Sequence, residues 1–318
     1  MVMAYILFVV GIYFLVKSAG WIIDGSSSLA KKLGVSSLII GLTVVGFGTS
    51  LPELIVNLFA AINGAPEIAF GNIIGSNISN ILLILGIAAM AGNIKIKSET
   101  IWKQIPFALL SAFVLFILTG KIFFNGNNLF SWNDGLILLA MFAIFLYYIF
   151  QIASKDRKHI GFVEGSNEPN SRIILKLAIG LIGIYFGGKW VVDGAVFIAG
   201  QFGLSEFLIS ATIIAIGTSL PELVVSIMAV MKKNVDLAVG NIIGSNIFNV
   251  LWVLGIVPFV APLQIPEFIG FDIGIMFLAT LLLFIFMFVG KKHGLSKKEG
   301  AAFVLFYILY IAYIIIRG

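Results

Sequence analysis

Long apolar runs dominate the sequence and predict a chain that crosses a membrane ten times. A helix needs about 20 apolar residues to cross a hydrocarbon core of about 30 Å. Runs of this kind lie at 2–24, 36–62, 67–91, 104–120, 134–152, 173–199, 205–231, 235–260, 268–290 and 299–316. Glycine and proline interrupt the second, third, seventh and eighth runs, so we expect these helices to be broken. The predicted fold class is an all-α polytopic membrane protein with ten transmembrane helices.

The connecting segments differ in their content of Lys and Arg. With the N-terminus outside, the inner-side segments hold 16 of the 20 Lys and Arg residues, whereas the outer side keeps only Lys121 and Arg317. Cytoplasmic loops retain Lys and Arg during membrane insertion. We therefore predict a multi-pass protein of the plasma (cell inner) membrane with both termini outside. The same distribution accounts for the net charge of +5, so nucleic acid is not expected as a partner.

Composition narrows the chemistry that the chain can perform. It is 60% hydrophobic and 11% charged, it has no cysteine, and both of its histidines lie in charged segments between apolar runs. Thiolate metal sites and cysteine nucleophiles are therefore excluded, and histidine-based catalysis is poorly supported. An intramembrane hydrolase would need a base beside Ser50 or Ser219, and the motif there contains no His, Lys or Asp. We expect no enzymatic activity and no cofactor.

The chain repeats itself with a shift of 169 residues. Residues 21–87 align with 190–256 without an insertion, and the alignment pairs "GTSLPEL" at 48–54 with 217–223 and "GNIIGSNI" at 71–78 with 240–247. Each half contains five predicted spans. Because five is odd, the second copy must enter the membrane from the opposite side. We predict two inverted five-helix repeats, at 1–152 and 173–318, joined by a polar cytoplasmic linker at 153–172.

One glutamate lies near the middle of a span in each repeat, Glu53 in 36–62 and Glu222 in 205–231. An ionisable residue at that depth is by default a functional candidate. Pro52 and Pro221 each lack a backbone N–H, so carbonyl oxygens of the preceding turn lose their helical partners. Inverted repeats with helices broken at matching positions indicate a transport site at the membrane midplane, between the repeats.

Neutral oxygen ligands accompany both glutamates. Thr49, Ser50, Thr218 and Ser219 lie within one turn of them. In the second motif, Ser76 and Asn80 are four residues apart and share a helix face, as do Ser245 and Asn249, so we place these four on the ion-facing side. Asn77 and Asn246 are turned about 100° away and are expected to bond between helices.

This all-oxygen inventory suits a hard cation. It contains two carboxylates, amides, hydroxyls and carbonyls, with no sulfur and no imidazole. Two carboxylates balance the charge of Ca²⁺, which accepts six to eight oxygens in flexible cages. The same cage could hold Na⁺, whereas Mg²⁺ is disfavoured because it dehydrates reluctantly.

"GTSLPE" followed by "GNIIGSN", present twice, resembles the sodium/calcium exchanger family of the cation/calcium exchanger superfamily, in its compact prokaryotic form. The resemblance covers essentially the whole chain. It implies an antiporter that works by alternating access, with Na⁺ moving inward to drive Ca²⁺ outward, and a lipid bilayer as its environment. We expect it to act as a monomer.

The resemblance also implies roles for individual residues. Glu53 and Glu222 match the central Ca²⁺ ligands, and Asn80 matches the central amide. Thr49, Thr218 and the carbonyls of Gly46 and Ala215 match positions shared by Ca²⁺ and Na⁺, while Ser50, Ser76, Ser219 and Ser245 match Na⁺ sites. Asn249 stands where many relatives carry Asp, which speaks against the K⁺-coupled variant of the family.

Two other transport hypotheses remain open from the sequence. The glutamates could carry protons in an H⁺/Ca²⁺ antiporter. By similarity, however, the proton-coupled branch of the superfamily carries a "GNxxE" pattern in place of GTSLPE, and this chain lacks that pattern. A passive channel is the other, but channels usually need oligomeric symmetry about a pore. For an antiporter, the first and sixth spans would slide across the rest, with Asp24 and Asp193 as cap or interface groups.

Overall fold

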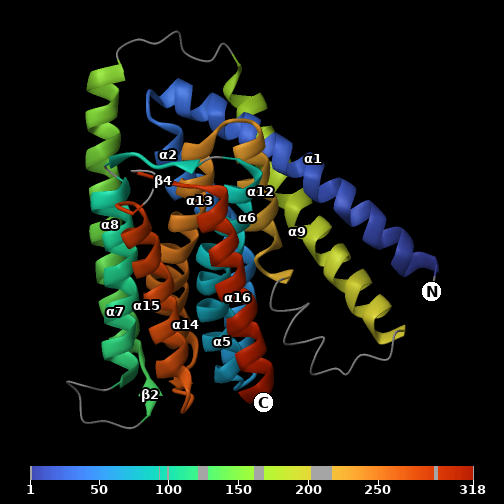
Figure 1. Cartoon of the computed structure of the whole chain (residues 1–318), viewed down its shortest axis with the longest axis vertical. Coiled ribbons are helices and arrows are strands. Elements are labelled where there is room, and N and C mark those ends of the chain that lie inside the picture. Colours follow the sequence, from blue (N-terminus) through green and yellow to red (C-terminus); the bar gives the residue numbers. More distant parts are fainter. Residues whose placement is uncertain are drawn as a thin grey trace.

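A computed structural model of the chain describes residues 2–92, 94–98, 100–120, 128–160, 168–201, 217–289 and 293–317. Within them, nine helical segments are long and apolar enough to cross a bilayer. The remaining expected span is the seventh along the chain, 205–231. The structure describes only its last part, which contains the helix α12 (Leu220–Met231). The helices form a bundle from which one pair diverges (Figure 1).

The elements of the first half follow the predicted runs, with longer outer helices. In order they are α1 (Val2–Leu33), α2 (Ser37–Ile40), η1 (Gly41–Val45), α3 (Gly46–Thr49), α4 (Leu51–Ile62), α5 (Pro66–Ile78), η2 (Ser79–Ile84), α6 (Leu85–Ala91), β1 (Ile94–Lys95), η3 (Thr100–Gln104), α7 (Ile105–Gly120), β2 (Leu129–Phe130) and α8 (Trp132–Ile160), where η marks a π-helical turn.

In its described residues the second half follows a similar order, without a separate π-helical turn at the positions equivalent to η3. Its described elements are α9 (Asn170–Gln201), α12, α13 (Val235–Ile247), η5 (Phe248–Val253), α14 (Leu254–Val260), β3 (Leu263–Gln264), α15 (Ile269–Phe286), β4 (Gly294–Leu295) and α16 (Lys297–Arg317). The helices α8 and α9 extend into the expected linker 153–172 from both sides. They do so because a helix can continue past the apolar core wherever its polar residues reach water.

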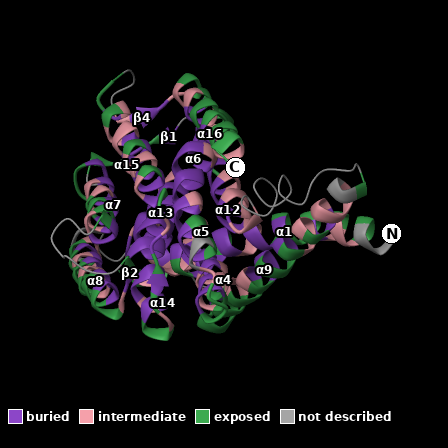
Figure 2. Ribbon diagram, turned by 90° about the horizontal axis from the view of Figure 1, so that it is seen from below, coloured by how far each residue is buried: buried purple, intermediate pink, exposed green. Residues whose placement is uncertain are grey.

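The two repeated "GNIIGSN" segments form the centre of the molecule. The spans that contain them, Ile68–Ala91 and Val235–Val260, are 78% and 83% buried, whereas those at Trp132–Arg157 and Lys297–Arg317 are 28% and 22% buried. Figure 2 shows the buried residues gathered around α13, α5 and α6, with exposed residues on α8 and α16. The apolar outer faces suit contact with lipid.

Close backbone contact explains two of the glycines at this centre. A Cβ on Gly240 would lie 2.6 Å from the Leu38 carbonyl oxygen, and one on Gly244 would lie 2.8 Å from the Leu42 carbonyl oxygen. Such distances to backbone atoms leave no room for a side chain. Gly240 and Gly244 therefore have a packing role, whereas a Cβ on their repeat equivalents Gly71 and Gly75 would meet nothing within 4 Å.

Two small antiparallel sheets join the halves at opposite ends of the bundle. β1 pairs with β4, and β2 pairs with β3. Under the shift of 169 residues, Ile94–Lys95 of β1 corresponds to Leu263–Gln264 of β3. In Figure 1, β4 lies near the top and β2 at the bottom, as an inverted duplication requires.

The helices α1 and α9 pack against each other and run diagonally away from the bundle (Figure 1). Small residues allow their approach, since a Cβ on Gly187 would lie 2.9 Å from the Leu15 amide nitrogen. These helices are equivalent under the repeat and are the first and sixth spans. Their separation from the bundle makes them the pair best placed to move as a unit.

Candidate ion-binding site

Each glutamate lies in the first turn of a half-helix. The backbone leaves helical geometry at Ser50 (φ −85°, ψ 1°), and α4 then begins at Leu51 with Pro52 and Glu53 in its first turn. Ser219 (φ −89°, ψ 6°), Pro221 and Glu222 repeat this arrangement at the start of α12. Proline fits here because the first helical turn needs no N–H donor. The predicted breaks at the two TSLPEL motifs are confirmed.

Both glutamates are withdrawn from water. Their exposed fraction is 0%, and the two carboxyl groups lie close enough to interact electrostatically. Two buried carboxylates without a counter-charge are strongly unfavourable, so an arrangement of this kind calls for a cation. The described residues contain no cluster of three or more His, Cys, Asp or Glu side chains, so the acidic part of the site is this pair.

A chain of hydroxyl contacts links the first repeat to Glu222. The Ser245 hydroxyl donates to Glu222 Oε1 at 3.3 Å and lies 3.2 Å from the Thr49 hydroxyl. The Gly46 carbonyl oxygen lies 3.4 Å from Thr49 Oγ1 and 3.5 Å from Ser245 Oγ. Thus Gly46 and Thr49 of one repeat meet Ser245 and Glu222 of the other, as their separate motifs led us to expect.

The other expected side-chain ligands hold buried oxygens that no protein group satisfies. In the described part of the chain these are Ser50 Oγ, both Oε atoms of Glu53, Ser76 Oγ, Asn80 Oδ1, Thr218 Oγ1, Ser219 Oγ, Glu222 Oε2 and Asn249 Oδ1. Buried polar atoms in proteins almost always have a partner. A concentration of acceptors without protein partners around two carboxylates offers the oxygen ligands that a hard cation needs. Ala215, the remaining expected ligand, lies outside the described residues.

Three polar residues beside the site were not predicted. Asn241 accepts a hydrogen bond from the Thr49 hydroxyl at 3.1 Å and donates to Ser226 Oγ at 3.0 Å. Asn57 donates to the Glu53 carbonyl oxygen at 2.7 Å, and its own Oδ1 has no partner. The repeat contained a signal for them, because Asn241 corresponds to Asn72 within the doubled GNIIGSN motif and Asn57 corresponds to Ser226.

Asn77 and Asn246 bond across the interface between repeats, as predicted. Asn77 Nδ2 donates to the Asn246 carbonyl oxygen at 3.1 Å, and Asn246 Nδ2 donates to the Asn77 carbonyl oxygen at 3.2 Å. The two residues are equivalent under the repeat, so the interaction is reciprocal. It joins α5 to α13 at the centre of the molecule.

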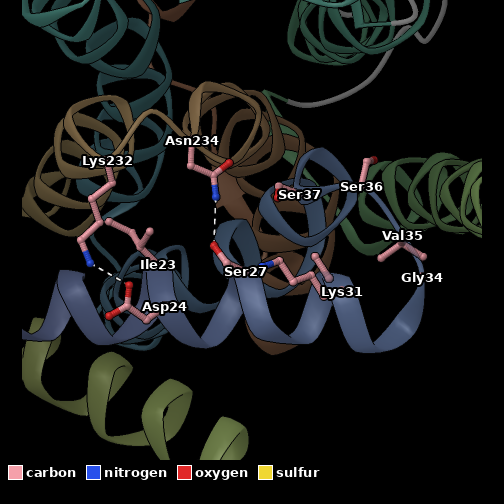
Figure 3. Close-up of a pocket in the computed structure, with 11 residues that line it drawn as sticks. Ile23, Asp24, Ser27, Lys31, Gly34, Val35, Ser36, Ser37, Lys232 and Asn234 are labelled. Atoms are coloured by element: carbon pink, nitrogen blue, oxygen red, sulfur yellow. Dashed lines mark hydrogen bonds and ion pairs between the residues drawn. The ribbon is translucent and has the colours of Figure 1, made fainter. Parts of the chain in front are cut away.

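A separate pocket of about 480 Å³ lies between the end of α1 and the turn that joins α12 to α13. Two contacts cross it (Figure 3): Lys232 pairs with Asp24 at 2.7 Å, and Asn234 Nδ2 donates to Ser27 Oγ at 3.1 Å. Asp24 is therefore an interface group and lies well before the end of α1. Its equivalent Asp193 pairs instead with Lys189 of its own helix, also at 2.7 Å.

Comparison with known proteins places this geometry in a family. Residues 3–151 and 173–316 match the family described as sodium/calcium exchanger protein. The chain belongs to this family. The inner membrane protein YrbG of Escherichia coli is 37% identical over 89% of this chain and 88% of its own length. The sodium/calcium exchanger MaX1 of Methanosarcina acetivorans is 30% identical over 96% of this chain and 97% of its own.

Solved structures of the sodium-calcium exchanger NCX_Mj share the fold. One of them, soaked with 100 mM Na⁺ and 10 mM Sr²⁺, is 32% identical to this chain, covers 98% of both chains and superposes with a TM-score of 0.82. The chain is thus a multi-pass membrane protein of the exchanger family with the ten-helix, inverted-repeat fold expected from its sequence.

Proposed function

We propose that the chain is a secondary antiporter that exchanges Na⁺ for Ca²⁺ by alternating access. The observation that carries this function is the set of unpartnered buried oxygens around Glu53 and Glu222, to which both repeats contribute. The set is uncharged apart from the two carboxylates. It therefore matches one divalent ion, or Na⁺ ions that neutralise the same pair. The names of MaX1 and NCX_Mj agree with this pair of substrates.

Charge compensation supplies the coupling between the two ions. In a low-dielectric interior the paired carboxylates are stable only when cations neutralise them. A site loaded with either Ca²⁺ or Na⁺ can then be closed off from water, whereas an empty site cannot. Because both ions need Glu53 and Glu222, they compete, and exchange follows without covalent chemistry or a cofactor. Sliding of α1 and α9 across the bundle would switch the side of access.

The finer features of the proposal rest on the residues themselves. The proposed ligand set consists of the side chains of Glu53, Glu222, Asn80 and Asn249, the hydroxyls of Thr49, Thr218, Ser50, Ser219, Ser76 and Ser245, and the carbonyls of Gly46 and Ala215. The distribution of Lys and Arg supports a place in the plasma membrane with both termini outside. We propose that one chain suffices, because both halves of the site lie within it.

Flux into proteoliposomes tests the function. Vesicles loaded with Na⁺ and diluted into Na⁺-free buffer should accumulate ⁴⁵Ca²⁺, and dissipation of the Na⁺ gradient should stop this uptake. Glu53→Gln and Glu222→Gln should each reduce uptake to the background of empty vesicles, because each removes half of the negative charge. Glu267→Gln, in an exposed position, is the matched control and should transport normally.

The proton alternative gives a different result in the same assay. Uptake that follows an imposed pH gradient in the absence of Na⁺ would replace Na⁺ by H⁺ as the driving ion. Uptake that persists in both glutamine variants would show that the ions bind elsewhere.

A further inference from the structure

Four asparagines form one closed network at the junction of the repeats. Beyond the reciprocal bonds from Asn77 and Asn246 to each other's carbonyl oxygens, Asn80 Nδ2 donates to Asn246 Oδ1 at 2.8 Å. Asn249 Nδ2 donates to Asn77 Oδ1 at 3.1 Å. Asn77 and Asn246 are equivalent under the repeat, as are Asn80 and Asn249, so the network has the same twofold relation as the whole chain.

The network determines which end of each amide faces the site. A backbone carbonyl oxygen can only accept, so the amide nitrogens of Asn77 and Asn246 must point at those carbonyls. Their Oδ1 atoms are then the ends that meet Asn249 and Asn80. An oxygen can be satisfied there only by an N–H donor, so Asn249 and Asn80 must turn their nitrogens toward the network.

The consequence is that Asn80 and Asn249 present their oxygens to the site. Both Oδ1 atoms are buried and have no partner in the described part of the chain. Both residues share a helix face with serines that lie beside the glutamates, since Ser245 bonds Glu222 and Ser76 lies next to Glu53. With exposed fractions of 0% for both residues, water cannot satisfy a reversed amide.

We propose that Asn77 and Asn246 are positioning residues that orient the ion-facing amides of the opposite repeat: Asn77 orients Asn249, and Asn246 orients Asn80. The inference rests on the proposed function, because it concerns the oxygens that would bind the cation. A bound cation needs oxygen ligands, and the partial positive charge of an amide N–H repels it. The network therefore holds the amides of Asn80 and Asn249 so that the oxygen, and not the nitrogen, is available to the cation.

The crossed pairing separates this role from ordinary packing. Asn77 and Asn80 are neighbours on one helix, whereas Asn77 and Asn249 meet only across the interface between repeats. A residue that merely packs α5 should affect its helical neighbour Asn80. A positioning residue should affect Asn249 and leave Asn80 unchanged.

The experiment measures Na⁺-driven ⁴⁵Ca²⁺ uptake in proteoliposomes, as KM for Ca²⁺ and maximum rate. Asn77→Leu and Asn246→Leu should each raise KM by about 3- to 10-fold, the effect of one lost hydrogen bond, with a smaller change in maximum rate. Met276→Leu is the matched control, because it removes only the contact between Met276 Sδ and Asn77 Nδ2 at 3.5 Å and leaves the orientation intact. Its KM should equal that of the unmodified chain.

Double variants give the decisive comparison. In a chain with Asn249→Ala, adding Asn77→Leu should raise KM little further, because no amide is left to orient. In a chain with Asn80→Ala, adding Asn77→Leu should raise KM by the same factor as it does alone. The mirror pattern is expected for Asn246→Leu, which should lose its effect with Asn80→Ala and keep it with Asn249→Ala.

Two outcomes would overturn the inference while the proposed function stands: an unchanged KM in both leucine variants, or coupling of Asn77 to Asn80 in place of Asn249. Absence of Na⁺-driven uptake in the unmodified chain would overturn the function itself. If a leucine variant aggregates in size-exclusion chromatography, Asn77→Ser and Asn246→Ser replace it, since serine is too short to make the contact and perturbs the helix less. The same pattern of coupling is required of them.

Discussion

The two glutamates are placed where a half-helix begins, and this position shapes the chemistry of the site. The N-terminal turn of a helix carries unsatisfied N–H groups and a partial positive charge, which favours a carboxylate. That favourable field is modest compared with the penalty for burying two interacting carboxylates. The remaining charge has to be neutralised by protons or by a cation, and the neutral hydroxyls and amides nearby provide the oxygen ligands that the proposed cation would need.

The hydroxyls of the two repeats are not used equally. Thr49 and Ser245 contact each other, and Ser245 bonds Glu222. Among the described residues, their repeat equivalents Thr218 and Ser76 have no hydrogen-bond partner for their hydroxyls. The half of the site around Glu222 is thus more fully bonded within the protein than the half around Glu53. If the proposed cation binds here, more of the acceptors available to it lie beside Glu53.

Asn241 provides a prediction at this scale. Asn241→Ala removes the acceptor of the Thr49 hydroxyl and the donor to Ser226, both buried. Without this acceptor, the Thr49 hydroxyl keeps only its longer contacts with the Gly46 carbonyl oxygen and Ser245 Oγ, and we expect KM for Ca²⁺ to rise by about 3- to 10-fold. Uptake of ⁴⁵Ca²⁺ measures this, with Asn63→Ala at an exposed position as control. An unchanged KM would limit Asn241 to a role in packing.

Sequence reasoning found the ligand candidates because the repeat doubled every signal. Glu53 and Glu222 could be recognised from their depth in an apolar span, and the prolines beside them from the loss of a helical donor. The contact of Asn241 with Thr49 could not be predicted from the sequence, because it joins residues 192 positions apart on different repeats. Such contacts depend on how α3 crosses α13, which the apolar pattern does not specify.

At the scale of elements, the breaks in the helices follow the repeat closely. The π-helical turns η2 and η5 occupy equivalent positions, Ser79–Ile84 and Phe248–Val253. Each contains an asparagine of the proposed ligand set, Asn80 or Asn249, and π-helical turns often lie at functional sites. Glycine and proline predicted interruption of these spans, but neither residue marks the π turns, so their position was not predictable. Helix ends were also misplaced, since α1 runs to Leu33 and not to residue 24.

The attachments of α1 and α9 to the bundle differ. Asp24 and Ser27 of α1 contact Lys232 and Asn234 of the α12–α13 turn. The equivalent positions on the other side carry Asp193, Val196, Asn63 and Ala65, so neither contact can form there. The C-terminal part of α1 is therefore attached to the bundle by an ion pair and a hydrogen bond that the equivalent part of α9 cannot form.

This difference predicts the effect of Lys232→Ala. Loss of the ion pair should let the end of α1 separate more often, and a cysteine at Ala30, buried in the pocket wall, should react faster with a maleimide. Exposed ion pairs contribute up to about 1 kcal/mol, so a rate increase of about 2- to 5-fold is expected. The chain has no native cysteine, so Ala30→Cys is the single reactive site.

Lys189→Ala is the matched control for that experiment. It breaks the ion pair with Asp193 inside α9 and leaves the ion pair between Lys232 and Asp24 in place. The reaction rate at Ala30→Cys should stay at that of the unmodified background. Equal rates in the Lys232→Ala and Lys189→Ala chains would mean that the contact with Asp24 does not hold α1.

For the whole molecule, the architecture was accessible from sequence because three independent patterns agree. Apolar run length predicted the spans, the shift of 169 residues predicted the duplication, and the odd number of spans per half predicted the inversion. The two small sheets were not predicted. Their strands have two residues each, and β1 and β4 are about 200 positions apart in the chain. They nevertheless show the inversion, because equivalent strands lie at opposite ends of the bundle.

Lys95 and Gln264 allow a direct test of this inversion. They occupy equivalent positions in β1 and β3, and both are exposed. With both termini outside, as we propose, an inverted duplication puts Lys95 on the cytoplasmic side and Gln264 on the outer side. A membrane-impermeant maleimide applied to intact cells should therefore label Gln264→Cys, and it should label Lys95→Cys only after permeabilisation. The native chain has no cysteine, so it is the background control. Labelling of both positions from the same side would require parallel repeats, and reversed labelling would place both termini in the cytoplasm.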